Sequence, residues 1–293
     1  MLGSILSQLM VHGMICYFGD DDLSGAAGYL AAVLGRAGVE YHHVPSWRKA
    51  PADFASRGFR GYILSDYPAA GFTTSQLAQL AEAVAQGAGL LMIGGWESFF
   101  GRTGEYRGTP LEQALPVYLA HDDDRVNCPQ GCVLRQVRHH PILEGLPWNV
   151  PPVVAGYNRL AAKPDARTLL VGVRLRIEDD VRQLRFSEAE VAPMLIVGKH
   201  GRGRTAALAC DVAPHWVGGM VDWGQGRIVQ HLPDGGFVEM GRAYAEFLHR
   251  LVTWTAGLAD WPDWYEDDVV TVPRIEAVEE DVADGAREAA PSR

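Results

Sequence analysis

Short apolar segments alternate with helical segments over the first third of the chain, and this alternation restricts the fold more than any other feature. A helix is expected from Gly25 to about Ala37 with Ser24 as its cap, and a second begins near Thr73 and closes at Gly87. The strands around them are expected at 14–18, 40–44, 61–65 and 90–93. Such a succession predicts a parallel sheet with helices on both faces.

The second half of the chain has a different pattern. Strands are expected at 132–137, 153–160, 168–176, 194–199 and 204–210, followed by a helix over about 237–255. The last two strands flank Gly201-Arg202-Gly203, which indicates a tight hairpin turn. The fold class is therefore α/β, with a mostly parallel sheet and an antiparallel extension. We expect a flexible extension over 1–13, one domain over 14–258, and an aromatic segment with an acidic, partly disordered tail over 259–293.

The charge distribution restricts the partners of the chain. The formal net charge is −10, and 11 acidic but only 3 basic residues lie between Asp260 and Arg293. The body is thus nearly neutral and lacks the clustered Lys and Arg that nucleic acid requires. No apolar run is long enough for a membrane helix, and the N-terminus lacks the features of a signal peptide. We expect a cytoplasmic protein that binds neither nucleic acid nor membrane.

Polar residues follow several of the expected strands directly. Asp20 and Asp21 follow the first strand, and Asp66 follows the third. The fourth strand leads into Gly94-Gly95-Trp96-Glu97, and the strand ending at Cys210 leads into Asp211 and His215. Because parallel strands present their carboxyl ends at one edge, we expect these residues to converge on a site for a small polar ligand. Asp211, His215 and Glu97 are the catalytic candidates, and the others are expected to bind ligand; each Asp can also serve as a turn former.

No cysteine or serine stands at the centre of the turn after the fourth strand. Ser98 lies just beyond it and Cys210 lies beside Asp211, but neither has the small-x-nucleophile-x-small context of an exposed nucleophile. The run 121–124 is expected to be a solvated acidic loop, and the pair His139-His140 is expected to have a structural role.

Four segments together resemble a bacterial family of glutamine amidotransferase-like proteins, related to trehalose-utilisation-type proteins, within the class I glutamine amidotransferase-like superfamily. They are Cys16-Tyr17-Phe18-Gly19-Asp20-Asp21, the run from Gly89 to Trp96, the run from His140 to Pro147, and the run from Ala209 to Trp216. The resemblance covers about residues 14–256 and implies a flavodoxin-like, three-layer α/β/α fold. It also implies a Gly-x-Cys-x-Gly elbow and a late His-x-Glu pair. Here the elbow is Gly94-Gly95-Trp96-Glu97-Ser98, and His215 is followed by Trp216-Val217, so glutamine hydrolysis by a cysteine triad is not expected.

Three functions stay open at this point. The first is binding of, or action on, a small polar metabolite such as a sugar or carboxylate at the strand ends. The second is a hydrolase that uses His215 and carboxylates, or a metal ion held by them. The third is an oligomerisation module, and a homo-oligomer is expected in any case. Its candidate interface is aromatic: Trp148, Trp223, Trp261, Trp264 and Tyr265.

Overall fold

The computed structural model describes residues 13–180, 183–232, 236–266, 268–271 and 280–281. The expected N-terminal extension and most of the acidic tail lie outside these residues. Within them, ten strands form one sheet in the order β2-β1-β3-β4-β11-β10-β9-β6-β7, with β14 (Glu280–Asp281) beside β10. No helix in this part of the chain is long and apolar enough to cross a membrane.

The first five strands of that order are parallel and have the flavodoxin arrangement. They are β2 (Tyr41–Val44), β1 (Ile15–Gly19), β3 (Gly61–Ser65), β4 (Gly89–Ile93) and β11 (Gly203–Leu208). In chain order the parallel strands run 2-1-3-4-5, the order of flavodoxin-like folds. The four strands expected in the first third of the chain are confirmed to within one residue at each end.

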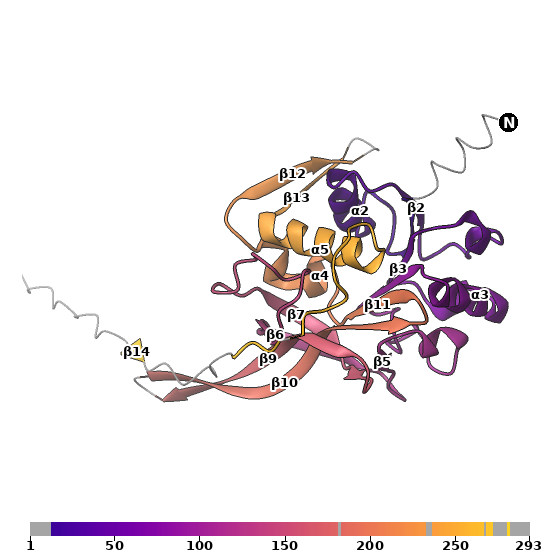
Figure 1. Cartoon of the computed structure of the whole chain (residues 1–293). Helices are drawn as coiled ribbons and strands as arrows, with labels where there is room; N and C mark the ends of the chain where they lie inside the picture. The colour runs from indigo at the N-terminus through magenta and orange to yellow at the C-terminus, as the bar shows by residue number, and fades with distance from the viewer. Residues whose placement is uncertain (1–12, 181–182, 233–235, 267, 272–279, 282–293) are drawn as a thin grey trace, which may run out of the picture.

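Helices cover both faces of this parallel half. α2 (Ala27–Arg36) and α5 (Arg242–Thr255) pack side by side on one face, and α3 (Thr74–Ala85) lies on the other (Figure 1). Of the three residues that could cap this helix, Thr73, Thr74 and Ser75, the structure selects Thr73, because its hydroxyl accepts from Gln76 N while the Gln76 side chain accepts from Thr73 N. The expected cap of α2 is wrong: the N-cap is Ala26, and no side chain caps the helix.

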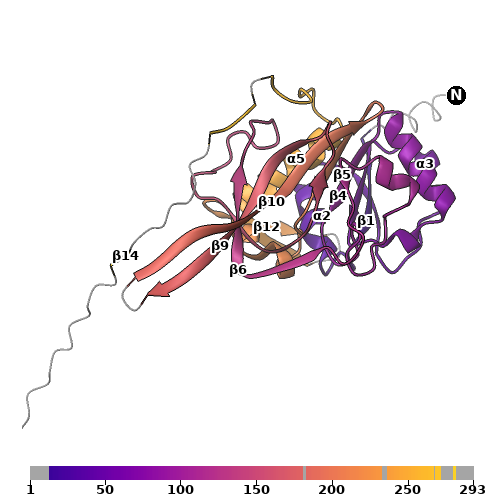
Figure 2. The ribbon, with the colours of Figure 1, turned by 90° about the horizontal axis from the view of Figure 1, so that it is seen from below.

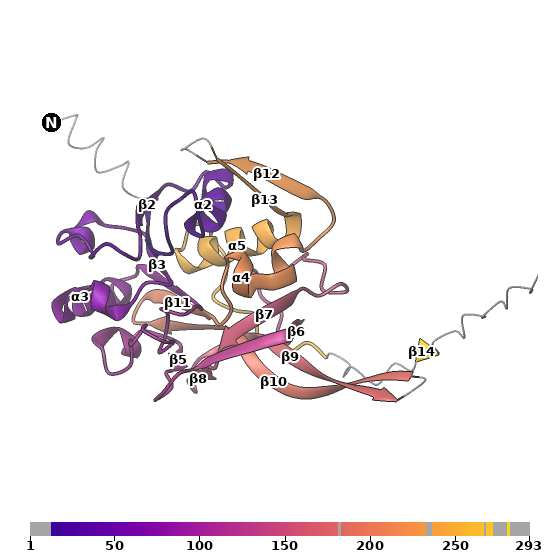
Figure 3. The ribbon, with the colours of Figure 1, turned by 180° about the vertical axis from the view of Figure 1, so that it is seen from behind.

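The antiparallel half consists of β6 (Arg125–Gln136), β7 (Val153–Asn158), β9 (Arg167–Asp180) and β10 (Gln183–His200). β10 joins β11 through the expected glycine turn. The expected helix over 237–255 is wrong in its first turn. Residues Phe237–Gly241 form β13, which pairs with β12 (Arg227–His231). Val238 and Met240 lie on one side of a strand because they are two residues apart, while Met240 also stands four residues before Tyr244, which is a helical spacing. Figure 3 shows this hairpin beside α2 and α5.

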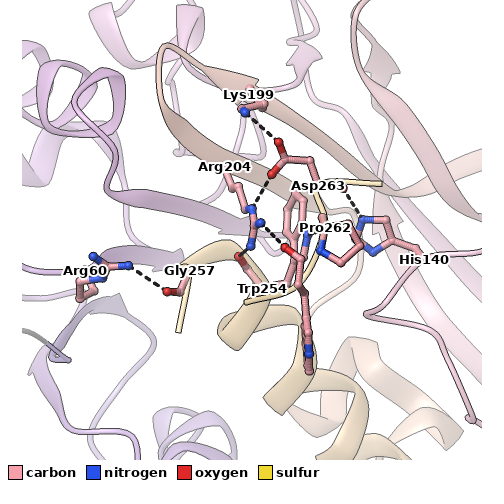
Figure 4. A network of polar contacts seen from close by, with 9 residues as sticks. Arg60, His140, Lys199, Arg204, Trp254, Gly257, Pro262 and Asp263 are labelled. Atoms are coloured by element: carbon pink, nitrogen blue, oxygen red, sulfur yellow. Dashed lines mark hydrogen bonds and ion pairs between the residues drawn. The ribbon is translucent and has the colours of Figure 1, made fainter. Parts of the chain in front are cut away.

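The segment after α5 is held against the sheet by ion pairs (Figure 4). Asp263 accepts hydrogen bonds from Lys199 Nζ and Arg204 Nε, each at 2.8 Å, and its backbone carbonyl lies 2.9 Å from His140 Nε2. Asp268 pairs with Arg138 and Arg167. The expected structural role of His140 is confirmed: burial lowers its pKa to about 4, so the ring is neutral at physiological pH.

The aromatic residues proposed as an interface are engaged within the chain. Trp261 packs against the core, the Arg167 guanidinium lies 4.7 Å from the Trp264 ring centroid, and the rings of Trp148 and Trp223 lie 4.8 Å apart. Trp254 Nε1 also donates to Pro262 O at 3.0 Å. These contacts fasten residues 261–264 to the body of the molecule.

Candidate functional site

Asp20 is buried at the carboxyl end of β1, where the chain adopts a left-handed conformation with φ +54°. Its backbone N donates to Ser65 O at 2.8 Å, and its carbonyl accepts from Ser46 N at 2.9 Å. The Tyr17 hydroxyl donates to its carboxylate. Burial, and then the negative charges of Asp211 and Asp66, raise the pKa of Asp20 well above its ordinary value.

Asp66 occupies the corresponding place at the end of β3, again with a left-handed backbone at φ +45°. Its carboxylate accepts from Glu97 N at 2.7 Å, and its own N donates to Ser98 Oγ at 3.0 Å. Asp66 thus fixes the turn that follows β4. Its strand, β3, is separated from β1 by β2 in the chain but lies next to β1 in the sheet, so Asp66 and Asp20 stand at neighbouring strand ends.

The glycine pair after β4 has a packing role. A Cβ on Gly94 would lie 2.0 Å from Ala209 O, and one on Gly95 would lie 2.0 Å from Asp66 Oδ1. Any side chain at either position would therefore collide with backbone or with the Asp66 carboxylate. Gly94 and Gly95 were predicted to bind ligand, and that role stays a prediction. The described contacts show that neighbouring protein atoms approach both glycines closely.

Trp96 and Glu97 lie on the solvent side of this turn. Trp96 is 43% exposed, and the Arg125 guanidinium lies 4.5 Å from its ring centroid. Arg125 in turn is held by two hydrogen bonds to Asp123, at 2.8 and 2.6 Å. Burial raises the pKa of Glu97; a hydrogen bond from Thr103 lowers it, and the charge of Asp21 raises it further. Asp21, which is exposed, therefore lies close enough to Glu97 to affect it.

Asp211 is fully buried after β11 and forms a turn with its own backbone. Its Oδ1 accepts from Val212 N at 2.6 Å and from Ala213 N at 2.9 Å. These bonds lead into α4 (Pro214–Val217), which contains His215. The His215 side chain lies outside the described part of the structure, so the predicted pairing with Asp211 stays a prediction.

Two residues that the sequence reasoning missed hold the turn after β4 in place. Asn158, the last residue of β7, accepts from Gly95 N at 2.8 Å and donates to Asp124 Oδ1 at 2.7 Å. Asp124 is 1% exposed and also accepts from Phe100 N and Gly101 N. The expectation of a solvated loop over 121–124 is therefore wrong for Asp124. Its position at the end of an acidic run gave no signal of burial.

The two weak candidates for a nucleophile are both buried. Ser98 is 1% exposed and accepts from Asp66 N. Burial raises the pKa of Cys210 to about 12, which keeps it a neutral thiol and a poor nucleophile. Among the described residues, no group of three or more His, Cys, Asp or Glu side chains is placed to hold a metal ion.

Asp20 and Asp66 stand at the carboxyl ends of the neighbouring strands β1 and β3, and Asp211 follows β11 in the same sheet. Trp96 is exposed beside the partly buried Glu97. A carboxylate can accept hydrogen bonds from hydroxyl groups, and an aromatic face can stack against an apolar ring face.

The strand order of the parallel half, with helices on both faces, defines the class of this protein as a flavodoxin-like α/β fold. The chain matches the family model GATase1_like, "Putative glutamine amidotransferase", over residues 64–229. This match spans more than half of the chain, which therefore belongs to this glutamine amidotransferase-like family.

Two solved structures from Salmonella typhimurium share the fold. Cytoplasmic protein STM3548 is 22% identical, with 82% of this chain and 98% of that chain covered and a TM-score of 0.62. Cytoplasmic protein STM1381, from strain LT2, is 25% identical, with 70% of this chain and 91% of that chain covered and a TM-score of 0.57. No curated protein matches the chain.

Proposed function

We propose that this chain is a cytoplasmic member of the family that has no cysteine-triad glutaminase activity and binds a small polyhydroxylated metabolite, such as a sugar, at the strand ends. The observation that carries the proposal is the turn after β4, where the exposed ring of Trp96 adjoins Glu97 and where Asp66, from the neighbouring strand end, accepts from Glu97 N. The Glu97 carboxylate is only partly buried and can accept hydrogen bonds from sugar hydroxyls. Trp96 offers an apolar face against which a sugar ring can stack.

The absence of glutaminase activity is proposed from the elbow sequence. The turn after β4 carries Trp96 and Glu97 in place of a cysteine, and the residue two places after His215 is Val217 rather than a glutamate. Ser98 and Cys210 are buried, as described above, so neither replaces the missing thiolate. Cytoplasmic location is supported by the names of the two similar Salmonella proteins.

The test is calorimetric titration of the purified full chain with a panel of monosaccharides, polyols and hydroxy acids, after native mass spectrometry for a copurified molecule. Trp96→Ala is expected to weaken binding about tenfold, which corresponds to about 1.4 kcal/mol. Trp264→Ala is the matched control. The Arg167 guanidinium lies over the Trp264 ring, as Arg125 does over Trp96, but Trp264 belongs to the segment after α5 and not to the turn after β4. It should leave the affinity unchanged.

Equal affinities for wild type and Trp96→Ala would contradict the placement of the ligand. Release of ammonia from glutamine would contradict the proposed loss of glutaminase activity. Breakdown of a bound sugar derivative, abolished in His215→Ala, would instead favour the hydrolase alternative.

A further inference from the structure

Strands β9 and β10 run further than their neighbours in the sheet. The pairing of β6 with β9 ends at Arg174, and the pairing of β10 with β11 begins at Leu195. Beyond these points the two strands pair with each other, and β14 touches β10 near the tip. Figure 2 shows the resulting two-stranded ribbon projecting from the body of the molecule. A two-stranded ribbon has little stability of its own in water.

One face of this ribbon is apolar. Leu175 and Ile177 alternate with Arg176 and Glu178, and Ile177 pairs directly with Phe186 across the ribbon. This alternation is typical of a strand that buries one of its faces. The Ile177 side chain is nevertheless 49% exposed.

The same face is hollowed at the base of the ribbon. Val171 pairs with Pro193, and Val173 pairs with Val191, so these side chains share the face of Leu175 and Ile177. A groove of about 330 Å³ lies here, lined in part by Val171, Val191 and Pro193, and Val191 is 48% exposed. The face therefore has an apolar protrusion at one end and a hollow at the other, and the lining of this hollow is mostly apolar but includes Thr168 and Arg138.

Two ion pairs neutralise charged groups beside this face, and one of them joins Arg138, which lines the groove, to Asp268. Arg135 and Glu188 form an ion pair at 2.5 Å, and each side chain is less than one-fifth exposed. A strongly charged partner would have to separate this pair. A second copy of the same face would meet it without repulsion, since apolar surface would lie against apolar surface.

We propose that this face of β9 and β10 is a homodimer interface, in which the Ile177–Phe186 tip of each copy lies in the base groove of the other. A two-fold axis generates both contacts at once, because protrusion and hollow lie on one continuous surface. The interface is then distinct from the aromatic cluster 261–265, whose side chains are engaged within the chain.

Sedimentation velocity of the full chain tests the proposal. The wild type is expected to be a dimer, and Ile177→Glu is expected to be a monomer, because it would bury a charge in the partner's groove. Val229→Glu is the matched control: Val229 is 53% exposed on β12, and its variant should remain a dimer. Circular dichroism checks that each variant is folded. A monomeric wild type would overturn the proposal and would indicate that this face binds a different protein. A folded Ile177→Glu variant that is still a dimer would also overturn it.

Cysteine cross-linking tests the arrangement without disturbing the fold. The four native cysteines are buried, so introduced surface thiols can be distinguished from them. A mixture of Ile177→Cys and Val191→Cys chains, oxidised mildly, should form a disulfide between chains. Ile177→Cys alone, and a mixture of Ile177→Cys with Val229→Cys, should not. Equal cross-linking in all three samples, or none in the first, would overturn the tip-to-groove arrangement.

Discussion

The parallel and antiparallel halves of the sheet differ in how their faces are covered. In the parallel half, β1, β3 and β4 are buried along their whole length between α2 and α5 on one side and α3 on the other. In the antiparallel half, one face packs inward, where a Cβ on Gly172 would lie 2.6 Å from Cys132 Sγ. The opposite face exposes Ile177 and Val191. One sheet thus combines a closed parallel half, in which only the strand ends are accessible, with an open antiparallel half, in which one face is accessible.

This difference separates two kinds of function in the molecule. A strand buried on both faces can offer chemistry only at its ends, and Asp20 and Asp66 stand there in left-handed turns. A strand buried on one face offers a surface instead, and surfaces of alternating apolar residues suit protein partners. The proposed ligand site and the proposed subunit contact therefore lie on different halves of the same sheet.

The largest expected effect is in the closed half. Gly94→Ala places a methyl group 2.0 Å from the Ala209 carbonyl oxygen, so the backbone must move, and we expect the free energy of unfolding to fall by about 3 kcal/mol or more. Gly35→Ala is the control, because a Cβ there meets nothing within 4 Å and Gly35 lies inside α2. That variant should gain about 0.5–1 kcal/mol. Urea unfolding measures both, and similar stabilities for the two variants would show that the closed half is not tightly packed.

The sequence predicted the closed half better than the open one for a physical reason. The strands 61–65 and 90–93 are short apolar runs whose boundaries are set by adjacent residues, and the Thr73 cap depends on a residue three positions away. The β6–β9 pairing joins residues far apart in the chain, such as Cys132 and Arg174, and local periodicity carries no information about it. Strand β13 was mistaken for helix because Met240 satisfies either period.

The candidate site shows the same division. The positions of Asp20, Asp66 and Asp211 at strand ends were predicted because each follows a strand of the parallel sheet, and their roles toward a ligand stay predictions. Asp124 and Asn158 were not, because they come from the antiparallel half and reach the turn after β4 only through its long-range pairing. Whether Asp21, Glu97 and His215 act on a ligand stays a prediction.

The next expected effect is a dependence of stability on pH in the closed half. The folded state raises the pKa of Asp20, so its stabilising contribution is complete below the ordinary carboxyl pKa and is lost as pH rises toward the folded value. Asp20→Asn should remove this loss, and its stability relative to wild type should increase as pH rises above about 4. Each unit of pKa shift corresponds to about 1.4 kcal/mol.

Asp268→Asn is the control with the opposite sign. Burial raises the pKa of Asp268, but hydrogen bonds and charge from Arg167 and Arg138 outweigh it and lower the pKa. That carboxylate stabilises the fold above the ordinary pKa, and the stabilisation is lost as pH falls toward the folded value. Urea unfolding from pH 4 to pH 8 should therefore show Asp268→Asn less stable than wild type by a nearly constant amount, while Asp20→Asn gains stability relative to wild type as pH rises; the Asp268→Asn deficit should shrink only below about pH 4. Parallel stability curves for Asp20→Asn and wild type would rule out a strongly raised Asp20 pKa.

The smallest expected effect concerns the segment after α5, which spans the boundary between the two halves. Asp263→Asn weakens its contacts with Lys199 and Arg204, and because these side chains are partly exposed we expect a loss of only about 1 kcal/mol. Asp53→Asn is the control, because the Asp53–Arg57 pair is a more exposed contact within one helical turn and should contribute less than about 0.5 kcal/mol. Thermal unfolding in low and high salt measures the difference. If the two variants were equally stable, the ion pairs of Asp263 would contribute no more than an ordinary surface pair, and the segment would be held by the packing of Trp261 and by the bond from Trp254 to Pro262.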